Sequence, residues 1–141
     1  MSKPAKIQLQ IYQGATFTKR FGWGSYLYAV TERNGVIVNV ATGRPAPSSD
    51  YIAINLTGWT ARMQARRKID DPDALFTLTT ENGGIFLGGI GGTVDIVMDA
   101  VKTSGFDWKN GVWDLELVAP GGSVTRLAEG SISVSPEVTR D

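Results

Sequence analysis

The sequence contains no cysteine and no histidine. Without cysteine the chain forms no disulfide and offers no thiolate nucleophile, iron–sulfur ligand or zinc knuckle. Without histidine it lacks the side chain that most often acts as a general acid or base near neutral pH and as a transition-metal ligand. These absences exclude Ser-His-Asp hydrolysis, HExxH proteolysis and zinc-dependent deamination. We therefore expect no enzymatic activity, no cofactor and no metal site.

An excess of charge of one sign is also missing. The 14 basic and 14 acidic residues give a net charge of zero, so the chain lacks the broad attraction to nucleic acid that a basic protein has. No apolar run approaches the roughly 18 residues of a transmembrane helix. The opening Met1-Ser2-Lys3-Pro4 is unlike a signal peptide. We expect a protein made inside the cell that binds neither membranes nor a specific nucleic acid.

The length and composition predict one globular domain. A chain of 141 residues with 42% hydrophobic content buries roughly two thirds of its unfolded surface, which is enough for a core without disulfides or metals. Glycine accounts for 17 residues. The glycines separate short apolar runs, as the tight turns of a β-protein require.

Alternating apolar and polar residues predict strands. Residues 7–11, 59–66 and 112–118 each alternate with a period of two, which is typical of a strand with one buried face. Asn34-Gly35 predicts a hairpin, because both residues tolerate a positive φ in a type I′ turn. Residues 99–105 form the best short helix. The fold class that follows is all-β: a single antiparallel β-sandwich, Ig-like or jelly-roll-like, with about ten short strands and at most one short helix.

We expect the domain to span residues 1–141, with a polar N-terminal arm (1–6), a hairpin and loop insert (24–55) and a C-terminal tail (135–141). Proline in the insert loop and at the start of the tail disfavours pairing within a central strand. The insert, the tail and a basic strand face therefore contain the residues that we predict to contact partners. These residues are Arg62, Arg66, Asn34, Pro45, Pro47, Pro136, Val138 and Arg140.

Several chemical alternatives remain open at this stage. Asp114 and Glu116 share a strand face about 6.8 Å apart, as a glycosidase carboxylate pair requires, but the polar face of any antiparallel sheet gives the same spacing. The acidic loop at 70–73 offers oxygen ligands for a cation yet lacks the glycine and distal glutamate of an EF-hand. Arg62, Arg66, Arg67 and Lys68 suit an acidic partner, a solvated face or single-stranded nucleic acid.

Glycine-rich segments are assigned to turns. Residues 83–92 resemble a phosphate-binding loop, but a strand follows them where a dinucleotide site needs a helix. Gly130, inside the last predicted strand, suggests a β-bulge.

Several segments, in the same order along the chain, resemble a family of small structural proteins of tailed bacteriophages. They are QGATF (13–17), LTGWTARMQAR (56–66), LTTENGGI (78–85), WDLELV (113–118), VTRLAEG (124–130) and VSPEVTR (134–140). The stretch between Trp23 and Asn55 departs from the family pattern, because a longer insert replaces a short link.

The resemblance implies a non-enzymatic virion component with a β-sandwich domain, made in the host bacterial cytoplasm. We expect an adaptor or anchor in the tail or baseplate-fibre apparatus, present in symmetric copies and contacting tail, fibre or capsid subunits. Two alternatives stay open: a capsid decoration (cement) protein and a carbohydrate-binding β-sandwich module. The latter needs exposed aromatic side chains.

Overall fold

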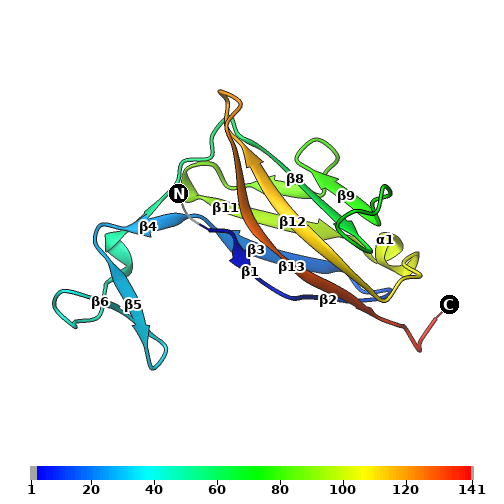
Figure 1. Ribbon diagram of the computed structural model, residues 1–141, viewed down its shortest axis with the longest axis horizontal. Coiled ribbons are helices and arrows are strands. Elements are labelled where there is room, and N and C mark those ends of the chain that lie inside the picture. Colours follow the sequence, from blue (N-terminus) through cyan, green and yellow to red (C-terminus); the bar gives the residue numbers. More distant parts are fainter. Residues whose placement is uncertain (1–2, 141) are drawn as a thin grey trace.

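The computed structural model describes residues 3–140 (Figure 1). Met1, Ser2 and Asp141, which belong to the predicted N-terminal arm and C-terminal tail, lie outside the described residues. Strands dominate, and the described chain contains one short α-helix, so the all-β prediction is confirmed. No helix among the described residues is long and apolar enough to cross a membrane.

The largest sheet has six strands. In spatial order the N-terminal strands lie at one edge, followed by β13, β12, β8 and β9. The bounds are β1 (Ala5–Lys6), β2 (Leu9–Tyr12), β8 (Thr60–Arg66), β9 (Phe76–Thr79), β12 (Asn110–Val118) and β13 (Val124–Ser135). Alternate residues of β8 and β12 are buried, as the period of two predicts.

A second sheet has three strands in the order β10–β11–β3. The bounds are β3 (Phe17–Gly22), β10 (Ile85–Leu87) and β11 (Thr93–Met98). A 3₁₀ turn, η2 (Gly89–Gly91), links β10 to β11. The helix α1 (Ala100–Ser104) follows β11, and the Asp99 side chain caps it by accepting a hydrogen bond from the Lys102 N–H.

Both larger sheets contribute to one hydrophobic cluster. Met63 and Leu115 from the six-stranded sheet and Val94 and Ile96 from the three-stranded sheet are at most 1% exposed. The Phe76, Phe106 and Trp108 rings stack beside them. The residues before and after the helix therefore belong to the same core as the strands.

The N-terminal strands correct one prediction. β1 and β2 pair with β13 in parallel, so the sheet is not purely antiparallel. Ala5 and Lys6, expected in a free arm, are part of this sheet. A Cβ on Gly130 would collide with the Ile7 backbone, so this glycine lets the N-terminal segment approach β13 closely. The bulge predicted at Gly130 instead lies opposite Leu115/Glu116.

Residues 24–53 leave the body as an arm, drawn in blue to cyan in Figure 1. Two separate two-stranded sheets, β4–β7 and β5–β6, build it. The bounds are β4 (Gly24–Tyr26), β5 (Val30–Arg33), β6 (Val36–Asn39), η1 (Ser48–Asp50) and β7 (Tyr51–Ala53). The described chain thus has thirteen strands rather than about ten. The C-terminal residues lie at the end of the molecule opposite the arm.

Candidate functional site

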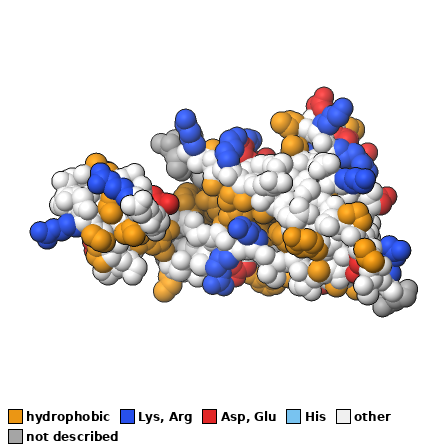
Figure 2. Space-filling view, turned by 90° about the horizontal axis from the view of Figure 1, so that it is seen from below, with side chains coloured by type: hydrophobic (Ala, Val, Ile, Leu, Met, Phe, Trp, Pro, Cys, Tyr) orange, Lys and Arg blue, Asp and Glu red, His pale blue; other side chains and the backbone are white. Residues whose placement is uncertain are grey.

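The arm exposes apolar side chains and has almost no core of its own. Val38, at 6% exposure, is the only buried residue among residues 24–53. Five large apolar side chains on the arm are exposed: Leu27, Val36, Val40, Tyr51 and Ile52. Figure 2 shows hydrophobic side chains gathered on the arm and on the adjoining part of the body. Because two-stranded sheets bury too little surface to be stable alone, such an arm suits contact with another molecule.

The predicted hairpin is present at the arm's outer end. Asn34 and Gly35 have φ values of 52° and 81°, which are the positive values that a type I′ turn requires. β5 and β6 pair in the register that a two-residue loop dictates, with Arg33 opposite Val36. The predicted contact residue Asn34 is therefore exposed at a tight turn.

The two prolines of the insert shape the return path of the arm. Pro45 forms an isolated antiparallel bridge with Val38, and Pro47 precedes η1 with an extended backbone. Both prolines are exposed. The Pro45 segment lies along the outer side of β6, where the Ala46 N–H donates to the Ile37 carbonyl. One edge of the arm hairpin is thereby covered.

The base of the arm is fixed by close backbone contacts. The Ile54 N–H donates to the Trp23 carbonyl, and the Trp23 N–H donates to the Gly92 carbonyl. The Trp23 and Trp59 rings pack edge to face, 5.4 Å between centroids. A Cβ on Gly92 would lie 2.7 Å from the Trp23 carbonyl oxygen and 3.0 Å from the Ile54 carbonyl oxygen. The junction therefore requires glycine at position 92.

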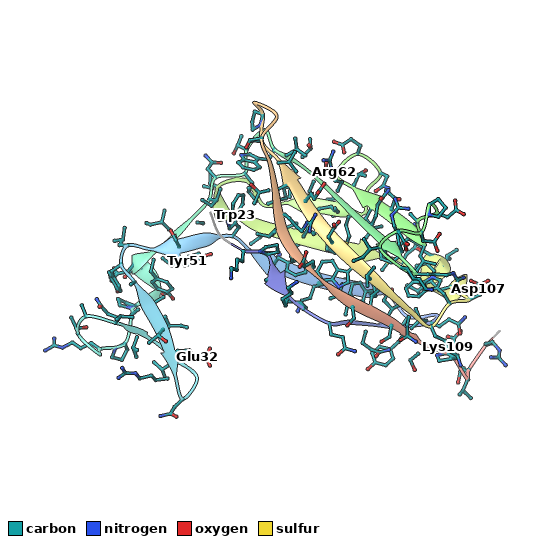
Figure 3. All side chains as sticks on the ribbon, in the orientation of Figure 1. Trp23, Glu32, Tyr51, Arg62, Asp107 and Lys109 are labelled. Carbon is teal, nitrogen blue, oxygen red and sulfur yellow. The ribbon has the colours of Figure 1, made fainter. Side chains whose placement is uncertain are left out.

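A tyrosine cluster lies between the base and the hairpin, near Tyr51 in Figure 3. Tyr26 packs against both Tyr28 and Tyr51. The Tyr28 hydroxyl donates a hydrogen bond to the Asp50 carboxylate, which raises the pKa of Tyr28 to about 12. This bond joins η1 to the strand side of the arm.

The C-terminal segment is the second exposed element. Pro136, Val138 and Arg140 are all exposed, and Val138 is 92% exposed. The Glu137 N–H donates to the Gln13 side chain, and the Arg140 guanidinium donates to the Glu137 carbonyl. The structure therefore does not bring the predicted tail contacts together with those of the insert; they lie at opposite ends of the molecule.

Arg62 lies on the outer face of the six-stranded sheet (Figure 3). Its guanidinium donates to the Glu116 carboxylate at 2.8 Å. On the same face, Arg126 contacts Glu129 at 3.0 Å and Asp114 at 3.6 Å. Arg62 is thus already paired across β8 and β12. An exposed ion pair of this kind contributes only about 0–1 kcal/mol to stability.

Arg66 lies beside a groove of about 390 Å³ on this face. Its guanidinium donates to the Gln64 side chain and to the Asp71 carbonyl, so it holds the loop after β8. The groove contains charges of both signs, and Trp113, its aromatic lining residue, is only 3% exposed. A sugar ring has no aromatic face to stack on there.

Asp114 and Glu116 do lie on one face of β12, as predicted. Burial, and next the neighbouring Glu116, raise the pKa of Asp114, while Arg126 lowers it. Each carboxylate faces an arginine across the sheet. The arrangement is that of a cross-strand charge ladder.

The acidic loop at 70–73 makes internal hydrogen bonds. The Asp71 carboxylate accepts a hydrogen bond from the Asp73 N–H. Between residues 3 and 140, no three aspartate or glutamate side chains gather in a way that could hold a metal ion.

The apolar side chains of the arm and its anchor at Gly92 were not among the predicted contact residues. The available signal was the uninterrupted apolar run Val36-Ile37-Val38 in the hairpin. In a strand with one solvated face, apolar and polar residues alternate, so this run predicts apolar side chains on both faces. Gly92 was interpreted as one of several turn glycines, because its contact with Trp23 joins segments far apart in the chain.

No protein-family model and no curated protein matches this chain. Among solved structures, the extracellular domains 3–5 of Drosophila OTK match with a TM-score of 0.33 and 13% identity. The match covers 93% of this chain and 33% of the OTK chain, so this chain spans about a third of that structure. A likeness this low carries no argument about fold or function.

Proposed function

We propose that this protein is a non-enzymatic structural component of a tailed-bacteriophage virion, acting as an adaptor or anchor in the tail or baseplate-fibre apparatus. The resemblance of its sequence segments suggests the virion. The observation that carries a contact role is the arm: residues 24–53 expose five large apolar side chains and bury only one residue. A surface of this kind gains stability when a partner covers it.

We also propose that the six-stranded and three-stranded sheets form one β-sandwich that serves as a rigid body for the arm. Support comes from the shared cluster that contains Met63 and Leu115 of one sheet and Val94 and Ile96 of the other. A packed body of this kind transmits force from the arm to the opposite end without rearranging.

The arm's composition suits a protein partner. It carries two acidic and two basic residues among residues 24–53, so its net charge is zero. An apolar surface with few charges is typical of the central part of protein interfaces. The charged face of the six-stranded sheet, in contrast, satisfies its own charges in pairs such as Arg62 with Glu116.

The test is to detect and count the protein in purified phage particles. We expect it in the particle, at a few to a few tens of copies relative to the major capsid protein. Several hundred copies per particle would contradict a role in the tail and favour a capsid decoration protein. Absence from purified particles, with the protein still present in the lysate, would refute the proposal.

A matched pair of variants isolates the arm. Leu27→Asp, which places a charge on the exposed arm surface, should reduce incorporation into particles while the purified protein keeps its melting temperature. Ile69→Asp, which changes an even more exposed apolar side chain on the body, should be incorporated normally. Equal incorporation of both variants would contradict a contact role for the arm.

A further inference from the structure

One edge of the arm hairpin has no main-chain partner among residues 3–140. β5 pairs with β6 on one side only. Ile37 and Asn39 direct their main-chain groups away from β5, toward Ala46 and Arg44. Their partners Glu32 and Val30 therefore direct their own N–H and C=O groups away from β6, to the open side. An unpaired strand edge is a template for another strand.

The C-terminal segment at the opposite end of the molecule lies beyond the end of β13 and also has main-chain groups free to pair. No main-chain hydrogen bond between residues 137–140 and another part of the described chain is present. The Glu137 N–H is already used by the Gln13 side chain. The chain bends at Val138 in the single copy. When residues 137–140 straighten into a strand, residues 138 and 140 direct their main-chain groups to the other side, away from the body.

We propose that residues 137–140 of one copy add as an antiparallel strand to β5 of a second copy. This inference rests on the proposed structural role and names the partner at the arm. It uses strand addition, in which main-chain hydrogen bonds supply affinity and side-chain pairing supplies the register.

One register satisfies both the backbone and the side chains. Placing Glu32 opposite Val138 puts the open main-chain groups of both strands in hydrogen-bonding positions. It also puts Arg33 opposite Glu137, an ion pair, and Thr31 opposite Thr139, a favourable cross-strand pair. Pro136, which has no N–H to donate, then falls opposite the turn residue Asn34, where pairing ends.

Charge complementarity favours this contact over pairing between two arms. Antiparallel β5–β5 pairing through the open main-chain groups places Glu32 opposite either Glu32 or Val30 of the second copy. Neither register places an acidic residue opposite Arg33. In the arm-to-tail register, Glu32 lies diagonal to Arg140 and Arg33 lies opposite Glu137, so both charges of the arm strand face opposite charges.

The geometry of the molecule sets the kind of assembly. The arm and residues 137–140 lie at opposite ends (Figure 1), so each copy presents both halves of the contact and leaves one of each free. A head-to-tail contact of this type produces a closed ring or an open filament rather than a simple dimer.

The test uses charge exchange in the purified full chain, with association measured by sedimentation velocity over a range of concentrations. We expect the unchanged protein to self-associate. Arg33→Glu alone and Glu137→Arg alone should each weaken association about tenfold, because like charges then face each other. An equimolar mixture of the two variants should recover association, because each arm then finds a complementary tail on the other variant.

Arg44→Glu, a charge reversal elsewhere on the arm, is the control and should associate as the unchanged protein does. A protein that stays monomeric throughout, or a mixture that associates no better than its components, would overturn the inference. Either result leaves the virion proposal standing, because that proposal depends on particle content. Absence from particles, conversely, leaves the sedimentation result valid.

Discussion

At the scale of single residues, the Tyr28–Asp50 hydrogen bond gives the arm a measurable signature. The carboxylate of Asp50 raises the pKa of Tyr28 to about 12. The folded protein therefore keeps the Tyr28 proton to a higher pH than the unfolded chain does. The stability that this hydrogen bond adds is present below the unfolded pKa near 10 and is lost as the pH rises toward about 12.

We predict that Asp50→Ala returns the pKa of Tyr28 toward its ordinary value near 10. Absorbance titration of phenolate should show one of the four tyrosines shifting to lower pH. Asp73→Ala, in a loop of the body, is the control and should leave the titration unchanged. An unaltered curve for Asp50→Ala would show that Tyr28 does not depend on this carboxylate.

Neutralising either of two aspartates on the outer sheet faces, Asp114 or Asp95, should change the free energy of unfolding in opposite directions. Burial raises the pKa of Asp114, so the folded protein binds this proton more readily than the unfolded chain does, and stability falls as the pH rises through the folded pKa. The bidentate hydrogen bonds from Arg20 lower the pKa of Asp95. The stability that Asp95 contributes is present above its unfolded pKa and is lost as the pH falls through its folded pKa.

We predict that Asp114→Asn raises the free energy of unfolding slightly at pH 7, by less than about 1 kcal/mol, because the side chain is partly exposed. Asp95→Asn should lower it at the same pH. Both differences should vanish at a pH low enough to protonate the carboxyls. Calorimetry at pH 7 and at low pH measures them, and two changes of the same sign at pH 7 would contradict the assignment.

At the scale of elements, the junction between arm and body depends on glycine. Gly92 has a φ of 67°, and a Cβ there would collide with the Trp23 carbonyl. We predict that Gly92→Ala destabilises the protein by about 1–3 kcal/mol, from the strained backbone and the displaced junction. Gly91→Ala, whose Cβ meets nothing within 4 Å, is the matched control and should be nearly neutral. Denaturant unfolding compares the two, and equal stabilities would contradict this account.

Alternation of apolar and polar residues predicted the strands that have one face on the core and one face in solvent. β8 and β12 follow it residue by residue, because their outer faces are solvated and their inner faces contact the core. The Asn34-Gly35 turn was predictable for a local reason, since two residues fix its backbone.

The parallel pairing of β1 and β2 with β13 was not predictable from periodicity. A strand has the same alternation whether its neighbour runs parallel or antiparallel, and these partners are more than 100 residues apart in sequence. The sequence predicted the insert as a hairpin and loop. That the insert forms an exposed arm depends on which of its side chains are buried in the three-dimensional structure. Among residues 24–53, only Val38 is buried, and it lies outside the shared core cluster.

Seven of the eight predicted contact residues are exposed, and Arg66 is half-buried. Arg62 and Arg66 already make hydrogen bonds within the body, whereas the other exposed residues are Asn34, Pro45, Pro47, Pro136, Val138 and Arg140. Their role in binding a partner stays a prediction. The charge run at 62–68 did not indicate that a carboxylate on β12 faces Arg62, because that pairing depends on sheet register.

At the scale of the whole molecule, the arm should be separable from the body. Trp23 and Ile54 are joined by a hydrogen bond of 2.9 Å at the base of the arm, so a two-residue Asn-Gly turn can replace residues 24–53. We predict that this shortened protein keeps the melting temperature of the body within a few degrees. Circular dichroism during heating measures it.

The control is a core substitution, Leu115→Ala, at a fully buried position of β12, which should cost about 2–5 kcal/mol in the shortened and in the full-length protein alike. If the shortened protein fails to fold, the arm contributes to the body's stability and the proposed division into body and arm is wrong.

The position of β13 between β12 and the N-terminal strands also bears on biosynthesis. Leu9 and Ile11 pair with Ile132 and Val134, which the ribosome adds more than 100 residues later. Until then the first strands of the nascent chain lack their partner in the sheet, and the loop that must close spans more than 100 residues. Completion of this sheet therefore waits until β13 has been synthesised, and dependence on chaperones should be greatest for ribosome-bound chains that stop short of residue 124.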